Sequence, residues 1–471
     1  MGDLKPYSEY KNSELPWLAK IPSDWEIMRA KNIFESIDIR SESGNEELLS
    51  VSEKYGVTPR KQVNVTMFKA ESYLGYKLCW PGDLVINSLW AWMQGLGFSK
   101  HHGIVSSAYG VYRLKEPLTS DFKYFDYLLR SKVYLWELRV NSKGIWRSRY
   151  QLTDESFFTI PVTIPPEHDR IQIVRFLDWK TSQINKFIKA KKRQIELLKE
   201  QKQVIINDAV TGKIDVLTGK LYPKYKDSGV EWLEKLPEDW RMFPIKAIAK
   251  SNLKALGEKT NPEYEFDYLE INKVKAGYIT DAPIHLRFAD APSRARRVVS
   301  YGDTIISTVR TYLRSVYYIN SADIKDLIVS TGFCVLTPKT NVFPIYLGYL
   351  LRSNYFIDKV IQNSVGVSYP AISDSKLMAL KAPLPQITEQ KQIVKAIETR
   401  TKNINLSIQN LESEITLLQE YQNSLVAGVV TGKIDIRDML IPEGYNTIDS
   451  DSAEEANVEE TIEEIPDEEI N

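Results

Sequence analysis

Thr211-Gly212-Lys213-Ile214-Asp215 recurs without change as Thr431-Gly432-Lys433-Ile434-Asp435, 220 residues later. Other short stretches recur at nearly the same offset. They are Tyr10-Lys11 with Tyr225-Lys226, Trp17-Leu18 with Trp232-Leu233, Gly82-Asp83 with Gly302-Asp303, and Gln172-Ile173-Val174 with Gln392-Ile393-Val394. Each half is far longer than the solenoid repeats of roughly 20–50 residues. The sequence therefore predicts two related domains with an internal pseudo-two-fold, which suits a two-part target.

The composition is that of a soluble globular protein. Among 471 residues, 43% are hydrophobic and 26% are charged. We find no run of about 18 or more apolar residues and no signal peptide, so we expect no membrane association. Cys79 and Cys334 lie in apolar, strand-like stretches, and we predict that both are buried, reduced thiols. This cysteine usage fits a cytoplasmic location.

The net charge of −1 conceals an uneven distribution. Residues 441–471 contain twelve acidic residues and no Lys or Arg, so residues 1–440 carry about +11. The composition of 441–471 predicts an acidic, disordered tail. A basic folded part is compatible with a polyanionic partner.

Two mixed segments alternate with two helical ones. The segments 1–165 and 216–385 contain short β-branched and aromatic runs bounded by turns, such as Leu84-Val85-Ile86 after Pro81-Gly82-Asp83. Each also contains a predicted short helix, at 124–130 and 346–352. The fold class that we expect is therefore α+β, with two mixed α/β domains separated by two long helices.

The segments 166–215 and 386–440 carry heptad patterns that begin after prolines and end at glycine. The a/d positions of the first are Val174, Leu177, Ile184, Ile188, Ile195, Leu198 and Ile205. Those of the second are Val394, Ile397, Ile404, Ile408, Leu411, Ile415, Leu418, Leu425 and Val429. Such a narrow stripe is typical of a coiled coil.

The polar residues on the seam indicate how the two helices pair. The first helix places Lys191 and Lys202 at seam positions, where the second has Leu411 and Gln422. A homodimer of the first helix would bring like charges together, whereas pairing the two helices avoids this. We predict an antiparallel coiled coil within one chain. The alternative is that each helix packs only on its own globular domain.

No catalytic constellation is evident. Thr-Gly-Lys-Ile lacks the glycine spacing of a phosphate loop, and Gly95-Leu96-Gly97 lacks the rest of a dinucleotide fingerprint. No Asn/Asp-Pro-Pro-aromatic run is present, and Ile164-Pro165-Pro166-Glu167 is not one. The adjacent His101 and His102 have no further ligands at metal-binding spacing. We therefore expect a chain with no catalytic residues, bound metal or cofactor of its own.

Basic and aromatic residues in turn-rich stretches are the candidate DNA contacts, because Arg, Gln and Lys can bind base edges or phosphates. They are Arg60, Lys61, Trp92, Gln94, Lys100, Lys143, Arg147 and Arg149 in the first half, and Arg294, Arg296, Arg297, Arg310, Tyr312 and Arg314 in the second. Residues 90–103 show no sequence match to 310–325. We therefore predict that the two halves read different sequences.

Each candidate also has a structural interpretation. Trp90 and Trp92 could be core or turn residues. The segment 147–149 could pair with the acidic residues at 154–155, and the arginines at 294–297 could form a solvated surface.

The motifs together resemble the specificity subunit of type I restriction–modification enzymes. The shared motifs cover residues 10–440. They are the Trp-Leu-x-Lys-x-Pro-x-Asp-Trp elements at Trp17–Trp25 and Trp232–Trp240, the Gly-Asp-strand elements at Gly82–Asn87 and Gly302–Ser307, the helix entry at Pro383–Ile393 and the two Thr-Gly-Lys-Ile-Asp endings. The first helix entry departs from the pattern, since His168-Asp169-Arg170 stands where the second has Thr388-Glu389-Gln390.

The resemblance implies that 1–165 and 216–385 are target-recognition domains for a bipartite site in double-stranded DNA. It implies that the helical spacers at 166–215 and 386–440 set the gap and dock two methyltransferase subunits. Two restriction/translocase subunits would complete the enzyme, and S-adenosylmethionine, ATP and Mg²⁺ would be bound by these partners.

Two alternatives come from other classes of protein. One is a DNA-binding specificity protein fused or allied to a different methyltransferase or nuclease system. The other is a coiled-coil scaffold that makes no DNA contact.

Overall fold

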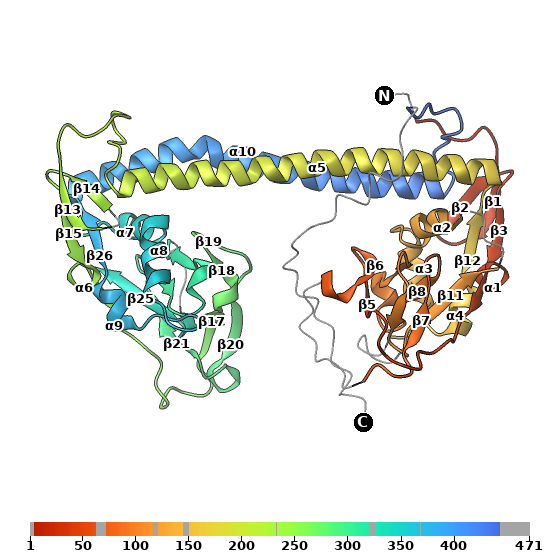
Figure 1. The fold of residues 1–471 in the computed structure, drawn as a ribbon, viewed down its shortest axis with the longest axis horizontal. Coiled ribbons are helices and arrows are strands. Elements are labelled where there is room, and N and C mark those ends of the chain that lie inside the picture. Colours follow the sequence, from red (N-terminus) through yellow and green to blue (C-terminus); the bar gives the residue numbers. More distant parts are fainter. Residues whose placement is uncertain are drawn as a thin grey trace. The chain divides into compact units, whose positions relative to one another are not determined.

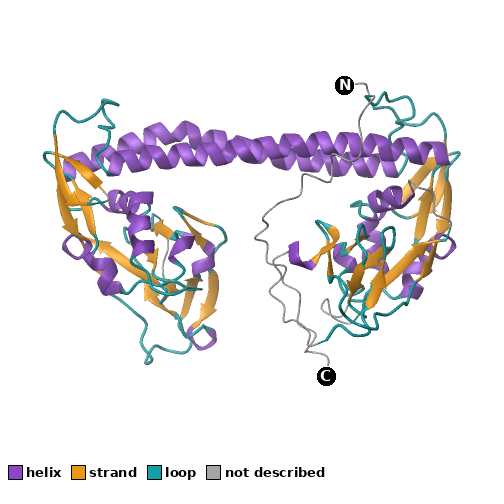
Figure 2. Ribbon diagram, in the orientation of Figure 1, coloured by secondary structure: helices purple, strands orange, loops and turns teal. Residues whose placement is uncertain are grey.

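The computed structural model describes residues 4–62, 72–115, 121–144, 150–231, 233–320, 326–367 and 369–442. The chain forms two compact units. Unit 1 comprises Met1–Lys191 and Ser413–Asn471, and unit 2 comprises Lys192–Glu412. Each unit combines a mixed α/β part with portions of two long helices (Figure 2), so the predicted α+β fold class is confirmed. The predicted acidic tail lies almost entirely outside the described residues.

The strands of unit 1 form one four-stranded sheet and four two-stranded ones. The four-stranded sheet has the order β4-β11-β8-β9, and the pairs are β1-β2, β3-β12, β5-β6 and β7-β10. Their bounds are β1 Tyr10–Leu15, β2 Leu18–Pro22, β3 Glu26–Arg29, β4 Phe34–Ser36, β5 Leu49–Ser52, β6 Gly56–Pro59, β7 Lys77–Cys79, β8 Leu84–Ile86, β9 Leu96–Phe98, β10 Gly103–Val105, β11 Gly110–Leu114 and β12 Pro161–Ile164.

Unit 2 repeats this plan and extends it. The sheet β16-β25-β22-β23 corresponds to the four-stranded sheet of unit 1, and a second four-stranded sheet has the order β20-β17-β24-β21. Three pairs complete it: β13-β14, β15-β26 and β18-β19. The bounds are β13 Tyr225–Val230, β14 Leu233–Pro237, β15 Arg241–Pro244, β16 Ala249–Ser251, β17 Glu265–Leu269, β18 Val274–Lys275, β19 Tyr278–Ile279, β20 Ile284–Arg287, β21 Ala295–Val298, β22 Thr304–Ser307, β23 Val316–Tyr318, β24 Leu327–Ser330, β25 Phe333–Pro338 and β26 Lys381–Leu384.

The short helices of the two units occur in the same order. The pairs are α1 Ala30–Ile33 with α6 Ile245–Ile248, α2 Asp121–Leu129 with α7 Pro344–Leu351, α3 Tyr134–Asn141 with α8 Asn354–Gln362, and α4 Asp154–Thr159 with α9 Asp374–Ala379. Hydroxyl caps begin equivalent helices, since Thr153 accepts from the Ser156 N–H and Ser373 accepts from the Lys376 N–H. The repeat found in the sequence is therefore a repeat of secondary structure.

The two long helices, α5 Glu167–Val210 and α10 Ile387–Val430, each contain 44 residues. Within each unit they lie side by side and antiparallel (Figure 1). In unit 1 the Lys191 ammonium contacts the Glu414 carboxylate, and in unit 2 Lys202 Nζ donates to Asn405 Oδ1 at 2.7 Å. Each seam lysine of α5 thus meets a polar partner on α10, as the charge argument predicted.

The predicted seam is buried along most of its length. Residues such as Leu177, Ile195 and Ile397 have exposures of 7% or less. Near the end of α5 the pattern shifts, because Ile206 is buried where Ile205 was predicted. A straight helix drifts by roughly 20° per heptad, and this last turn also packs into the unit 2 core. The two helices therefore pair with each other, as the coiled-coil prediction states. They also contact a globular core, as in the alternative in which each helix packs on a globular domain.

A polar contact anchors the start of α10 in unit 2. Glu389 Oε1 accepts hydrogen bonds from the Tyr222 hydroxyl at 3.0 Å and from the Trp240 indole nitrogen at 2.9 Å. Trp240 is fully buried. The single Glu389 carboxylate therefore accepts from both donors, which offsets the free-energy cost of removing them from water.

The equivalent contact in unit 1 is incomplete. Asp169 stands at the start of α5 where α10 has Glu389, and its carboxylate lies 2.7 Å from His168 Nε2. Among the described residues, the buried Tyr7 hydroxyl and Trp25 indole nitrogen have no hydrogen-bond acceptor. Burial raises the pKa of the Asp169 carboxyl. The aspartate side chain is one methylene shorter than glutamate and does not reach both donors.

We predict that Asp169→Glu stabilises unit 1, because the longer side chain can accept from Tyr7 and Trp25. The expected gain in unfolding free energy is about 1–2 kcal/mol. Glu389→Asp should destabilise unit 2 by about 2–4 kcal/mol, since it leaves two buried donors unpaired. Amide hydrogen exchange measures the opening of each unit separately. A loss of protection in unit 1 of Asp169→Glu would contradict this interpretation.

Both cysteines are buried and free, as predicted. Burial raises the pKa of Cys79 to about 11 and that of Cys334 to about 12, so both thiols stay protonated at neutral pH. Across the described part of the chain, the model has no helix that is both long and apolar enough to span a bilayer.

Candidate nucleic-acid interface

The two units share a strand–turn–strand element in which the strands and the turn follow in the same order. In unit 1 it consists of β8, the 3-10 turn η2 (Ala91–Met93) and β9, and in unit 2 of β22, η6 (Thr311–Leu313) and β23. The two turns lie 220 residues apart. Gln94 and Arg314 follow them in left-handed conformation, with φ of 59° and 56°. Residues 90–98 therefore have a structural counterpart at 310–318, although their sequences do not match.

A second segment lies beside each turn. In unit 1 it comprises residues 143, 144, 150 and 151, with the bridge Lys143↔Gln151, and in unit 2 residues 365–367 and 369–371, with the bridge Val365↔Ala371. In unit 1 the Leu152 N–H donates to the Ser88 carbonyl at 2.9 Å, and in unit 2 the Ile372 N–H donates to the Thr308 carbonyl at 2.9 Å. We call each turn together with its neighbouring segment a reading module.

The side chains of the unit 1 module are mainly aromatic. Trp90 and Trp92 stack with ring centroids 6.1 Å apart and an interplanar angle of 16°. Tyr150 meets Trp92 edge to face at 5.9 Å, and Arg139 Nε donates to the Trp92 carbonyl at 3.2 Å. Both indoles are half-buried. Trp90 and Trp92 are therefore turn residues, in agreement with their structural interpretation. Part of the surface of each indole remains accessible to a ligand.

The side chains of the unit 2 module are cationic and exposed. Arg310 adopts a φ of 49°, and its guanidinium lies 4.8 Å from the ring centroid of Tyr369. Tyr312 and Tyr369 are 50% and 64% exposed, and Val367 is fully exposed. The ring of Tyr369 orients the guanidinium through a cation–π contact. The same arrangement of strands and turn thus carries a different chemical surface in each unit.

Gln94 is not available as a base-reading residue. It is 5% exposed, and its Nε2 donates to the Ser131 carbonyl at 2.8 Å. The left-handed conformation that follows η2 turns this side chain inward. Arg314 occupies the equivalent position and is also held internally, by Asn354 Oδ1 at 2.6 Å and Asp358 Oδ1 at 2.7 Å. Both residues fix the turn.

The other predicted contacts of unit 1 lie on separate segments. Arg60 and Lys61 form the 3-10 turn η1 (Arg60–Gln62), and Lys61 Nζ lies 3.9 Å from Glu47. Lys100 and Lys143 are exposed, and Lys143 begins the second segment of the module. Arg147 and Arg149 lie outside the described residues.

The arginine cluster of unit 2 lies on β21 and at the residue just before it, and β21 belongs to a different sheet from the module. Arg294 is 62% exposed along its side chain and lies 3.4 Å from Glu270. Arg296 stacks on Phe288 at 4.6 Å, and Arg297 lies 3.6 Å from Asp374. The structure therefore groups Arg310 with Tyr312 and Tyr369 but not with Arg294, Arg296 or Arg297.

The sequence analysis did not single out Val367, Tyr369 or Arg139. One signal pointed to the first two. At the 220-residue offset of the helices that follow, Arg147 and Arg149 of the first half correspond to Val367 and Tyr369 of the second half. The sequence contains no comparable signal for Arg139, because this side chain donates to a backbone carbonyl, which every residue type provides.

The sequence and fold match known specificity proteins. Residues 237–417 match the family model of the type I restriction modification DNA specificity domain. The type I restriction enzyme MjaVIII specificity subunit of Methanocaldococcus jannaschii is 22% identical over 445 residues, which are 92% of this chain and 98% of that protein. The EcoKI specificity subunit of Escherichia coli K12 is 23% identical over 104 residues, which are 22% of each protein.

A solved structure shares the fold. It is described as the structural basis of complex assembly and conformational transition of the type I R-M system. It matches 88% of this chain and 99% of its own, with a TM-score of 0.58 and 16% identity. Residues 237–417 thus match a DNA specificity domain, and 92% of the chain is similar to a type I restriction enzyme specificity subunit.

Proposed function

We propose that this chain is the specificity subunit of a type I restriction–modification enzyme, that it binds double-stranded DNA and that each unit reads one half of a bipartite site. The observation that carries the proposal is the pair of reading modules. Their turns lie 220 residues apart and are each followed by a residue in left-handed conformation, whereas one module presents two tryptophans and the other presents Arg310 with exposed tyrosines. A fixed framework with different side chains is what two different half-sites require.

We further propose that α5 and α10 set the unspecified gap between the half-sites. Each is an unbroken helix of 44 residues, about 66 Å long at 1.5 Å per residue. A stiff connection fixes both the distance and the rotational phase of two readers on a duplex with roughly 10.5 base pairs per turn.

The same helices are the proposed docking surface for two methyltransferase subunits. Large apolar side chains are exposed on them, which is unusual for a solvated helix. In unit 1 they include Phe187, Leu417 and Tyr421, and in unit 2 Leu197, Val204 and Leu406. Two restriction/translocase subunits would complete a cytoplasmic complex. S-adenosylmethionine, ATP and Mg²⁺ would be bound by the partners, and this chain would contribute no catalytic residue.

A salt titration of DNA binding tests the proposal. The purified chain, alone and with methyltransferase subunits, is titrated with a duplex at 50–200 mM salt, and the target is identified by mapping methylated adenines in cells. Phosphate contacts predict a steep loss of affinity with salt, and the mapped site should be interrupted by unspecified bases. A salt-independent or undetectable interaction would favour the scaffold alternative, and a continuous site would exclude the two-reader proposal.

The acidic residues beyond Pro442 should weaken the binding of DNA without any sequence preference. Removing 443–471 takes away twelve negative charges. We expect the affinity for random duplex DNA to rise about fivefold at 50 mM salt and the effect to shrink at 200 mM, because salt screens the repulsion. A tail of the same length with Gln and Asn in place of Glu and Asp should reproduce the truncation. If it behaves like the native tail, charge is not the cause.

A further inference from the structure

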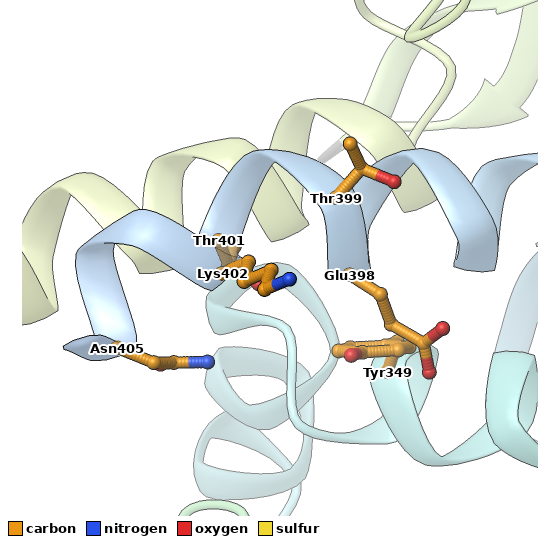
Figure 3. A pocket seen from close by; sticks show the side chains of 6 residues that line it. All are labelled: Tyr349, Glu398, Thr399, Thr401, Lys402 and Asn405. Atoms are coloured by element: carbon orange, nitrogen blue, oxygen red, sulfur yellow. The ribbon is translucent and has the colours of Figure 1, made fainter.

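A polar pocket of about 330 Å³ lies in unit 2 between α7 and α10. It is lined by Tyr349, Glu398, Thr399, Thr401, Lys402 and Asn405. Glu398, Lys402 and Asn405 are spaced to share one side of α10. Figure 3 shows Asn405 at one end of this group and Glu398 at the other, beside the Tyr349 ring, with Lys402 between them.

The donors of this pocket outnumber its acceptors. The hydroxyls of Thr399 and Thr401 are occupied within α10, because they donate to the carbonyls of Lys395 and Ile397 at 2.8 Å. Asn405 Oδ1 accepts from Lys202, so its amide nitrogen is left to donate. The ammonium of Lys402 adds three further donors.

Two more cations stand behind the lining residues. The guanidinium of Arg352 stacks on the ring of Tyr349 at 4.3 Å, and the Arg352 carbonyl accepts from Gln203 Nε2 at 3.3 Å. Arg352 Nε is buried without an acceptor among the described residues. Lys202 reaches the same region from α5. Three cations therefore surround a pocket that has one carboxylate, at its Glu398 end.

These cations lack nearby counter-charges. Within the described part of the chain, no carboxylate oxygen lies within 4 Å of the charged nitrogens of Lys202, Arg352 or Lys402. Burial lowers the pKa of Lys202, and the neighbouring charges of Arg352 and Lys199 lower it further. Burial also lowers the pKa of Arg352. Buried positive charge without a partner is costly, and a bound anion would relieve the cost.

We propose that the Lys402–Asn405 end of this pocket binds a phosphodiester group of the DNA backbone. This inference rests on the proposed function and extends it to the helical spacer. A polymer phosphate suits an open pocket, since it needs donors on one side only. Phosphate contacts carry no base information. A spacer helix that contacts DNA in this way would position the duplex while leaving the gap sequence unspecified.

Lys402→Ala tests the proposal in the full chain. The expected result is a several-fold loss of affinity at 100 mM salt that is equal for target and random duplexes. The slope of log affinity against log salt should become shallower by about one. Lys402→Arg should restore binding, and Glu398→Gln should increase it, because the mutation removes the only negative charge of the lining.

Arg400→Ala is the matched control. Arg400 is exposed on α10, and its guanidinium lies beside Gly219, away from the pocket. If Lys402→Ala and Arg400→Ala behave alike while the native chain keeps its steep salt slope, the pocket proposal is wrong and the proposed function stands. If the native chain shows no salt-dependent binding, the proposed function itself fails. If Lys402→Ala weakens only the binding of inorganic phosphate, the occupant is a free anion and the DNA assignment is overturned.

Discussion

Gly212→Ala is expected to destabilise unit 2 by about 3–5 kcal/mol, combining left-handed strain with overpacking. Gly212 adopts a φ of +70° after the end of α5. A Cβ atom there would lie 2.5 Å from Pro237 Cδ, 2.6 Å from Pro237 Cγ and 3.2 Å from the Trp240 ring. The proline ring is held in the β13–β14 pair, so the clash is with a part of the structure that cannot move away cheaply.

The cap geometry explains why this glycine recurs in the sequence. The Lys213 N–H donates to the Asp208 carbonyl at 3.0 Å. This backbone hydrogen bond is typical of helices that end at a left-handed glycine. Gly432 repeats the arrangement in unit 1, where a Cβ atom would lie 2.3 Å from Pro22 Cδ. The glycine thus ends the helix and allows the Trp-containing element to pack against it.

Gly229→Ala provides the control within the same unit. Gly229 has a φ of +72°, and a Cβ atom there would meet nothing within 4 Å. The expected cost is about 1 kcal/mol from backbone strain alone. Hydrogen exchange of unit 2 amides separates the two variants. If Gly212→Ala costs no more than Gly229→Ala, packing against Pro237 is not what requires the glycine.

Arg310→Ala is expected to lower the affinity for the target duplex by about 10- to 100-fold, or about 1–3 kcal/mol. The reason is that the exposed guanidinium, oriented by Tyr369, can donate two hydrogen bonds to one base edge. Arg310→Lys should recover only part of this affinity, because an ammonium keeps the charge but loses the planar pair of donors. Duplexes with single substitutions in the half-site of unit 2 measure the effect.

Arg287→Ala is the matched control for Arg310→Ala. Arg287 lies on β20, is half-exposed, and is already paired with Asp290 at 2.8 Å and Glu263 at 3.2 Å. It should leave the base preference unchanged. A loss in Arg310→Ala that is uniform across all sequences would indicate a phosphate contact. The absence of any loss would place Arg310 outside the interface.

The contacts that anchor the modules explain why the surroundings of Gln94 and Arg310 could not be told from sequence. Gln94 follows a 3-10 turn in a Leu- and Trp-rich stretch, and Arg310 precedes the equivalent turn in a more polar one. One is buried against the Ser131 carbonyl, and the other is exposed beside Tyr369. The difference depends on which residue follows a left-handed turn and what packs beneath it. Neither factor is visible in the local composition.

The sequence by itself determined the duplication, the two long helices with their ends, and the antiparallel pairing of their seams. These features depend on residue spacing within one element and on glycine and proline at its ends, which are short-range properties of the chain. Only the tertiary structure decided which basic residues meet, that Asp169 falls short of Tyr7 and Trp25, and that Arg352 and Lys202 converge on one pocket. Those contacts join residues far apart in sequence, and their positions are set by how each unit packs as a whole.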